Sequence, residues 1–445
     1  MGITGHRPNK LSDLQSDTVD QSIHVILDHI KVSAETCRTT HAEFFSDTAS
    51  DLRLVTALAE GADTIAAMAA IEREFKLDVI LPFQRDIYIE KQQFAPSATK
   101  TFHALLDSPR TNCVFELTDG FHDDADDTEL YLAAGRRMLA FSDVVIAVWD
   151  GEDAAGRGGT AQIIREAIAR GITVIWINLN GTACILDDRE HLENLDRSQA
   201  FPTEAGAALD ETVYDRIVGH IAPPELEQKA RDRVLKFMTE PTPERSWWSA
   251  YNLMRSVILK SPIALRVNYA VDENTEAAWT RYNKHARKIG GEQFSETLKQ
   301  TIETRWRHAD AVSVHCSHAY RSTYVLNFIL AGFAVLFGLL SVFWWKHDHS
   351  IVIKGGFVLA EFILIVSIII LTWLGREDRN DWHIRWLEAR AFAELMRSGR
   401  TLSLIGQTAS PPAEKVTRTP SYAWIEWLTR ATLREIPPPT GQLDA

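Results

Sequence analysis

Two patterns of apolar residues divide this chain of 445 residues. Over residues 1–182, short apolar runs rich in β-branched residues alternate with stretches in which apolar residues recur at helical spacing. The runs predicted to form strands are Leu52–Leu58, Asp78–Phe83, Cys113–Leu117, Val144–Trp149 and Thr173–Asn178. Continuous apolar strands between helices predict an α/β fold with a Rossmann-like, doubly wound parallel sheet. The opening letters MGIT leave little of a first strand, so either the domain begins with a stub or its true start lies upstream.

The second pattern is continuous rather than alternating. Residues 325–345 contain no charged side chain, and a helix of that length spans a hydrocarbon core of about 30 Å. Residues 351–374 form a second apolar run, which is interrupted by Lys354 and Glu361. Because the polar link KHDHS between the runs is very short, they predict an antiparallel transmembrane hairpin. The alternative, a buried hairpin of a soluble protein, fits this length and apolarity less well.

The remaining segments are expected to be mainly helical. Residues 183–300 are polar and irregular, with helical stretches such as KARDRVLKFM, and predict a helical connector. We expect a membrane domain over residues 301–408, in which an amphipathic helix follows the second span. That helix either continues the span into a cytoplasmic bundle or lies on anionic lipid. Residues 409–445 are expected to form a tail with a short amphipathic helix.

Charge and cysteine content narrow the function classes. A net charge of −13 disfavours a nucleic-acid partner, because phosphate backbones require a basic protein face. The four cysteines are widely spaced without a CxxC pair, which argues against a zinc site or disulfide framework and suits a reducing cytoplasm.

The start of the chain lacks the pattern of a signal peptide. Cations flank the two predicted spans on the side away from the link, which predicts a multi-pass protein of the cell (inner) membrane with both termini in the cytoplasm. These cations are Arg305, Arg307, Arg321, Arg376, Arg379, Arg385 and Arg390, against Lys346 and Lys354 on the side of the link.

Three glycine-containing turns follow predicted strands. They are Gly5-His6-Arg7, Glu60-Gly61-Ala62-Asp63 and Gly158-Gly159-Thr160. In open α/β sheets, ligands bind beyond the carboxyl ends of the strands, where amides at helix N-termini attract anions. Each turn alone is ordinary, but together they predict one phosphate-binding site, which Asp150 could also reach. No GxxxxGK[ST] loop, metal site or resident cofactor is predicted, so simple ATPase or GTPase chemistry is not expected.

Four stretches carry a resemblance to a known superfamily. The segments GITGHRP, ALAEGADTIAAMAA, VILPF and SDVVIAVWDG…GRGGTAQII resemble the SLOG superfamily, Rossmann-like domains that include the cytokinin-activating phosphoribohydrolases. The two-span portion resembles the SLATT family of effector modules, which accompany SLOG domains and nucleotide-synthesising partners in bacterial defence. The resemblance implies a domain that senses a nucleotide derivative of the NAD or ADP-ribose type. It also implies a membrane module that assembles into an oligomer and opens or disrupts the bilayer.

One departure from the superfamily bears on catalysis. The phosphoribohydrolases carry acidic residues two and three positions after the threonine of the last glycine turn. Here those positions hold Gln162 and Ile163, and the next carboxylate, Glu166, is one helical turn further on. The site is therefore expected to hold a ligand rather than to cleave it. A membrane-tethered nucleotide glycosidase and a structural anchor with a degenerate Rossmann domain remain the alternatives.

Glu361 is expected near the midplane of the bilayer, where an ionised carboxylate is costly. Either several copies of Glu361 line a cation pathway in a homo-oligomer, or one neutral Glu361 bonds across the hairpin. Small residues mark each span, and their spacing lets helices approach closely. They are Ala334, Gly338 and Ser341 on the first span and Gly356, Ala360 and Ser367 on the second. Two spans alone cannot enclose a pore, so a channel requires several copies.

Overall fold

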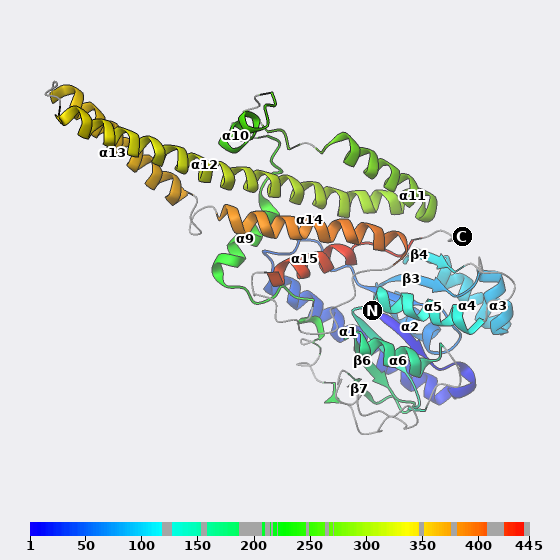
Figure 1. Cartoon of the computed structure of the whole chain (residues 1–445). Helices are drawn as coiled ribbons and strands as arrows, with labels where there is room; N and C mark the ends of the chain where they lie inside the picture. The colour runs from blue at the N-terminus through cyan, green and yellow to red at the C-terminus, as the bar shows by residue number, and fades with distance from the viewer. Residues whose placement is uncertain are drawn as a thin grey trace. The chain divides into compact units, whose positions relative to one another are not determined.

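The computed structural model forms two compact units (Figure 1). It describes residues 1–117, 127–152, 158–186, 207–209, 214, 217–219, 221–245, 249–262, 267–269, 271–346, 351–374, 381–406 and 422–439. Unit 1 comprises Met1–Leu235, Trp279–Ile302 and Ser398–Ala445, and unit 2 comprises Lys236–Ala278 and Glu303–Arg397. The polar link between the predicted spans, at 347–350, and the cations Arg376 and Arg379 lie outside the described residues.

Among its described residues, unit 1 contains a mostly parallel sheet of eight strands in the order β4-β3-β2-β1-β5-β6-β7-β8. The strands are β1 (Gly2–Gly5), β2 (Arg53–Thr56), β3 (Lys76–Leu81), β4 (Thr111–Glu116), β5 (Val144–Val148), β6 (Thr173–Ile177), β7 (Ala183–Leu186) and β8 (Ala207–Ala208). The first six are parallel, and all five predicted strands are among them, which confirms the α/β prediction. The antiparallel edge of β7 and β8 extends the sheet beyond residue 182 and was not predicted.

A tight turn explains why β7 reverses direction. Asn178 directly follows β6, and its side-chain oxygen accepts the N–H groups of Asn180 at 3.0 Å and Thr182 at 2.9 Å. Gly181 adopts φ +77°, which glycine tolerates without strain. Together these features form a hairpin where the parallel pattern would otherwise require a helical crossover.

Helices cover both faces of the sheet. They are α1 (Asp13–Thr40), α2 (Ala62–Glu72), α3 (Arg85–Gln92), α4 (Pro96–Leu106), α5 (Asp127–Ala140) and α6 (Thr160–Ala169). A helix from the end of the chain, α15 (Ala423–Arg434), also belongs to unit 1. Alternate residues of β5 show the two layers: Ile146 and Val148 pack with α1 and α2, whereas Val145 and Ala147 pack with α5 and α6. The strands are therefore buried on both sides, as their apolar runs predicted.

The sheet positions one edge for binding. Strand β1 lies between β2 and β5. Strands β2, β3 and β4 extend the sheet on one side of β1, and the later strands extend it on the other side. Gly5 at the end of β1 pairs in register with Val148 at the end of β5. The carboxyl ends of both strands, and the N-termini of α2 and α6 that follow β2 and β5, therefore meet at one switch point.

Unit 2 is built around two long apolar helices that run antiparallel, α12 (Thr304–Lys346) and α13 (Ile351–Leu374) (Figure 1). Each contains a window of mean hydropathy 2.4 that is long and apolar enough to cross a membrane. These windows are 6% and 0% buried within the protein, so their apolar side chains face outward. The other elements are α10 (Ala250–Ile258) and parts of α9 (Gln228–Thr239), α11 (Glu273–Leu298), the short π-helix Lys299–Glu303 and α14 (Trp382–Leu404).

Small and polar residues lie between α12 and α13. Ala334 is buried, and a Cβ on Gly338 would meet Glu361 Oε1 at 3.1 Å. Gly356, by contrast, has open space where a Cβ would be, so it lies outside the contact between α12 and α13 of one chain.

Candidate functional site

The first glycine turn ties the end of β1 to β5 and to α2. A Cβ on Gly5 would lie 2.5 Å from Ala62 Cβ and 2.9 Å from Val148 Cβ, so only glycine fits here. The His6 N–H donates to the Val148 carbonyl at 3.0 Å, and the Ala62 N–H donates to the His6 carbonyl at 3.1 Å. The N-terminus of α2 is therefore held directly against the end of β1.

The second turn contacts the first. Gly61 adopts φ +106°, and a Cβ there would lie 2.5 Å from the His6 carbonyl oxygen and 3.0 Å from Arg7 Cα. Both the backbone conformation and the close approach therefore require glycine at this position. The sequence-predicted residues Gly5, His6, Arg7, Gly61 and Ala62 thus form one continuous surface.

The third turn reaches the same edge through α5. Gly158 adopts φ +78°, and a Cβ there would lie 2.9 Å from the Leu132 amide nitrogen and 3.2 Å from Tyr131 Cβ. The Gly158 N–H donates to Gln162 Oε1 at 2.9 Å. Gly159 then precedes α6, which begins at Thr160. Residues 153–157, before this turn, lie outside the described part of the chain.

Arg7 lies between the second and third turns. Its guanidinium carbon is 5.8 Å from the centre of the Tyr131 ring, and Tyr131 borders Gly158. On its other side, the Arg7 backbone borders Gly61. Because the Arg7 side chain is exposed, it offers a cation between two glycine turns.

Asp63 supplies a buried carboxyl group beside this cation. Its side chain is 6% exposed and accepts the Ala57 N–H at 3.3 Å and the Thr56 hydroxyl at 3.4 Å. Burial raises the pKa of Asp63 to about 7, although these hydrogen bonds and the Arg7 charge act in the opposite direction. Burial, followed by the charge of Asp63, also raises the pKa of the neighbouring Tyr88 hydroxyl well above its usual value.

Asp150 organises a second polar cluster at the end of β5. Its Oδ2 lies 2.7 Å from Lys10 Nζ, and its Oδ1 lies 2.9 Å from His6 Nε2. Although partial burial acts in the opposite direction, Lys10, the Glu152 amide and His6 lower the pKa of Asp150 to about 2. Burial lowers the pKa of His6 more than the charge and hydrogen bond of Asp150 raise it. The Asp150 amide nitrogen also lies 2.9 Å from His6 Nε2.

The sequence did not identify several partners of these residues. Lys10, Tyr88 and Tyr131 join the site through packing of elements far apart in the sequence, and no local motif marks them. Glu166, the nearest carboxylate after the third turn, pairs with Arg136 at 2.8 Å. This ion pair joins α6 to α5, and the Glu166 charge is already paired.

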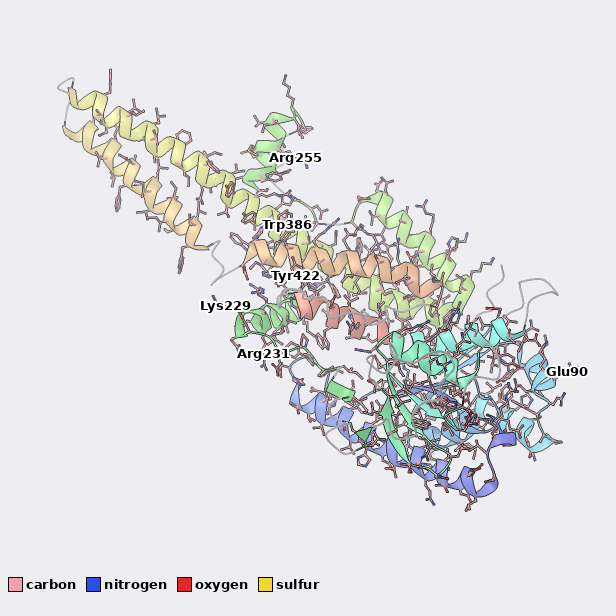
Figure 2. The ribbon with its side chains drawn as sticks, turned by 60° about the horizontal axis from the view of Figure 1, so that its bottom comes forward. Glu90, Lys229, Arg231, Arg255, Trp386 and Tyr422 are labelled. Atoms are coloured by element: carbon pink, nitrogen blue, oxygen red, sulfur yellow. The ribbon has the colours of Figure 1, made fainter. Side chains whose placement is uncertain are left out.

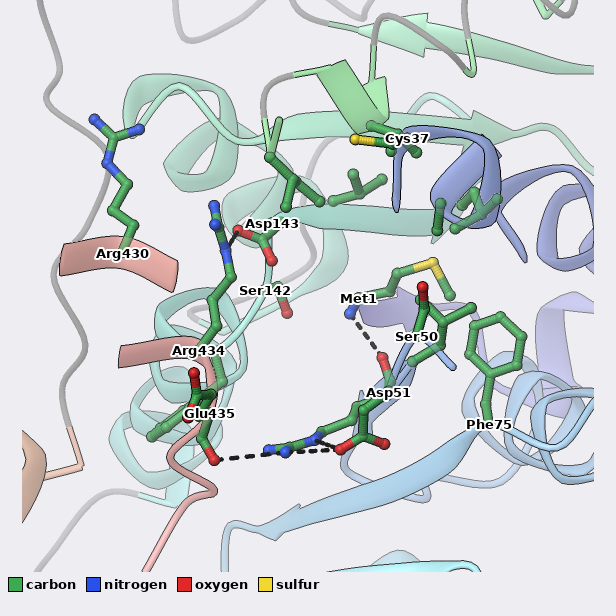
Figure 3. Close-up of a pocket in the computed structure, with 18 of the residues that line it drawn as sticks. Met1, Cys37, Ser50, Asp51, Phe75, Ser142, Asp143, Arg430, Arg434 and Glu435 are labelled. Atoms are coloured by element: carbon green, nitrogen blue, oxygen red, sulfur yellow. Dashed lines mark hydrogen bonds and ion pairs between the residues drawn. The ribbon is translucent and has the colours of Figure 1, made fainter. Parts of the chain in front are cut away.

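A cavity of about 600 Å³ lies at the opposite, amino edge of the sheet (Figure 3). Met1, Arg53 and Asp143 line it, together with the end of α15, where Arg434 Nε donates to Asp143 Oδ1 at 2.7 Å. This cavity offers space for a ligand. The N-terminal amides of α2 and α6, however, point to the other edge of the sheet. The carboxyl edge, with Arg7 and the three turns, is therefore the better anion site.

The chemistry of the carboxyl edge follows from these groups. Helix N-termini, glycine turns and an exposed guanidinium favour a phosphate, and an aromatic ring lies within reach of the same cation. Within the described ranges, no group of three His, Cys, Asp or Glu side chains is placed to hold a metal ion. No protein-family model matches the chain, and it matches neither a curated protein nor a solved structure.

Proposed function

We propose that unit 1 is a Rossmann-like, SLOG-type sensor that binds a nucleotide-derived ligand at the carboxyl edge of its sheet. The observation that carries this proposal is the position of Arg7 between the Gly61 and Gly158 turns. A phosphate bound there would receive a charged donor from Arg7 and lie at the N-termini of α2 and α6. The protonated form of Asp63 would add a hydroxyl donor for a ribose oxygen or a second phosphate.

The ligand class that fits best is a phosphorylated nucleoside of the NAD or ADP-ribose type. Two aromatic residues, Tyr88 and Tyr131, lie near Arg7, and Tyr131 offers a face for a base or sugar. The resemblance to SLOG domains favours the same class.

The α12–α13 hairpin is the proposed effector. In this proposal it spans the inner membrane with both termini in the cytoplasm, as the cations Arg305, Arg307 and Arg321 before the first span favour. Several copies would assemble, because two spans cannot enclose a pore. Glu361 lies against Gly338 within one hairpin, so opening would require Glu361 to turn toward a pathway between copies. Ligand binding would favour that assembly through its higher affinity for the open state.

The resemblance to SLATT modules adds bacterial defence as the setting of this proposal. The single-chain contact between Glu361 and Gly338 equally suits the simpler alternative, in which one neutral carboxyl group stabilises the hairpin. Cation flux through vesicles that contain the full chain separates these two roles.

A second function, a membrane-tethered nucleotide glycosidase, is favoured by one observation. Asp63 is buried beside Arg7 and has a pKa of about 7, which suits a general acid or base at neutral pH. Gln162 and Ile163 occupy the positions at which the phosphoribohydrolases carry acidic residues, so Asp63 would have to act alone.

The experiment is a thermal-unfolding screen of the full chain in lipid nanodiscs against NAD, ADP-ribose, AMP and cyclic dinucleotides. A ligand at 100 times its dissociation constant stabilises the folded state by about 2.7 kcal/mol. Chromatography of the same samples detects any product. Stabilisation without turnover supports the sensor, and turnover supports the enzyme. Absence of both for every ligand contradicts each proposal and favours a structural anchor.

A further inference from the structure

Helix α10 is fixed to α12 just before the first apolar span. Ser249 caps α10 by accepting the Asn252 N–H at 3.1 Å, and its hydroxyl lies 3.1 Å from the Ser322 hydroxyl of α12. The Tyr251 N–H also donates to Ser322 Oγ, at 3.3 Å. Ser322 precedes Val325, where the apolar run begins, by three residues. At a rise of about 1.5 Å per residue, α10 is attached about 5 Å from the start of the span.

Aromatic and charged residues strengthen this attachment. The Arg321 guanidinium lies 5.2 Å from the centre of the Tyr251 ring on α10 and 4.8 Å from that of Trp386 on α14. His318 Nδ1 lies 3.2 Å from Ser249 Oγ. The orientation of α10 on α12 is therefore determined by several contacts, and Figure 2 shows the labelled Trp386 and Arg255 within this region.

The face of α10 that points away from α12 is apolar. Leu253, Val257 and Ile258 are 37%, 65% and 67% exposed, and Leu259 directly after the helix is 63% exposed. By contrast, the polar Ser256 is buried. This is the reverse of a surface helix in water, where apolar side chains face the protein. The exposed apolar residues thus form one patch on a helix whose N-terminus is attached beside the start of the span.

Cations accompany this patch. Arg255 is exposed on α10, and Lys260 is exposed two residues beyond its end. An apolar face bordered by cations is typical of a helix that lies in the interface of an anionic membrane. The aromatic rings of Tyr251, Tyr320 and Trp386 lie near the same level of the bundle, where tyrosine and tryptophan are enriched in membrane proteins.

We propose that α10 is an interfacial helix that lies in the leaflet where α12 enters the membrane. Val257, Ile258 and Leu259 contact acyl chains there, while Arg255 and Lys260 contact anionic lipid headgroups. This proposal rests on the proposed function in one respect, that α12 and α13 span the bilayer. The lipid is favoured over a protein partner because several contacts attach α10 beside the start of the span and cations border its apolar patch.

Photo-crosslinking of the full chain in vesicles of phosphatidylcholine and phosphatidylglycerol tests the proposal. Val257→p-benzoylphenylalanine places the photoreactive group on the patch, and mass spectrometry identifies its adducts. The same substitution at Val335, which is 64% exposed on the first span, reports whether that span is inserted. Leu14, 77% exposed on α1, provides the negative control. We expect lipid adducts at 257 and 335, and several-fold fewer at 14.

Each outcome has a distinct meaning. Adducts at 335 without adducts at 257 overturn the interfacial helix but leave the membrane hairpin intact. A protein adduct at 257, to a second copy of the chain, also overturns it. Absence of lipid adducts at both positions overturns the membrane span and this proposal together.

The double variant Arg255→Gln, Lys260→Gln tests the headgroup contact. It should lower the adduct yield at 257 several-fold in the anionic vesicles, and an unchanged yield contradicts that contact.

Discussion

The carboxyl group of Glu361 on α13 lies against the backbone of Gly338 on α12, where a Cβ would stand 3.1 Å from Oε1. The absence of a side chain at Gly338 creates the space that the Glu361 side chain occupies between the helices. A second polar contact, between Asn327 Nδ2 and Thr372 Oγ1 at 3.3 Å, joins the same two helices. Each contact brings a polar side chain of one helix against the other helix.

Gly338→Leu should therefore loosen the hairpin. The leucine side chain needs the space of the Glu361 carboxyl group, and overpacking of this kind costs about 1–3 kcal/mol. We expect the backbone amides of α13 to exchange hydrogen faster in nanodiscs. The rate should rise about tenfold for each 1.4 kcal/mol of lost stability.

Gly332→Leu is the matched control for this change, because a Cβ on Gly332 of the same helix meets no atom within 4 Å. Exchange of α13 should remain as in the wild type. Equal effects of the two substitutions would contradict the contact between Gly338 and Glu361.

Gly61→Ala should destabilise unit 1. Alanine at φ +106° is strained, and its Cβ would lie 2.5 Å from the His6 carbonyl oxygen. Backbone strain costs about 1–3 kcal/mol and the clash adds to it. The free energy of unfolding should therefore fall by roughly 2 kcal/mol or more. Thermal unfolding of the full chain measures the change, at about 2–4 °C per kcal/mol.

The control for Gly61→Ala is Gly219→Ala in the same unit, since a Cβ at Gly219 meets no atom within 4 Å. Its effect should stay below about 1 kcal/mol. If the two alanine variants unfold at the same temperature, the close approach of the first two glycine turns is wrong.

The strands of unit 1 were predictable because burial on both faces produces an unmistakable apolar run. Val144–Val148 and Thr173–Ile177 appear within one residue of the predicted bounds. The antiparallel edge was not predicted because β7 is short and half-buried, so its residues lack that run. Its direction depends on the turn at Asn178 and Gly181, which a search for strand–helix alternation overlooks.

The candidate site was predictable only in part. Gly5, Gly61 and Gly158 could be predicted from the sequence because each lies at or after the end of a strand, and the structure explains each by a close approach. Tyr131 on α5 contacts Arg7, which follows β1, and also borders Gly158. That contact depends on tertiary packing, which local spacing does not encode.

Arg7→Ala should weaken ligand binding without unfolding the protein. The side chain is exposed, so its removal leaves no cavity, but a phosphate loses a charge-assisted hydrogen bond of about 1.5–3 kcal/mol. The dissociation constant of a stabilising nucleotide should rise roughly 10- to 150-fold, as measured by titration calorimetry.

Arg110→Ala is the matched control for Arg7→Ala. Arg110 is 41% exposed and lies before β4, at the amino edge of the sheet, where its guanidinium donates to the Glu74 carbonyl at 3.0 Å. Its removal should leave the dissociation constant unchanged. Equal weakening by both variants would indicate a general charge effect and not a site at Arg7.

The buried carboxyl group of Asp63 predicts a particular pH dependence of stability. Its pKa rises from 3.8 to about 7 on folding, so the folded state binds more protons between these values. The stabilisation is fully present below pH 3.8 and is lost as the pH rises through about 7.

Asp63→Asn removes this titration while keeping an oxygen that accepts the Ala57 N–H. Between pH 5 and pH 8 the free energy of unfolding of the wild type should fall by roughly 2–3 kcal/mol relative to that of this variant. Unfolding midpoints at both pH values measure the change. Parallel pH profiles of the two proteins would show that Asp63 is ionised throughout, and would remove the argument for a general acid or base at this position.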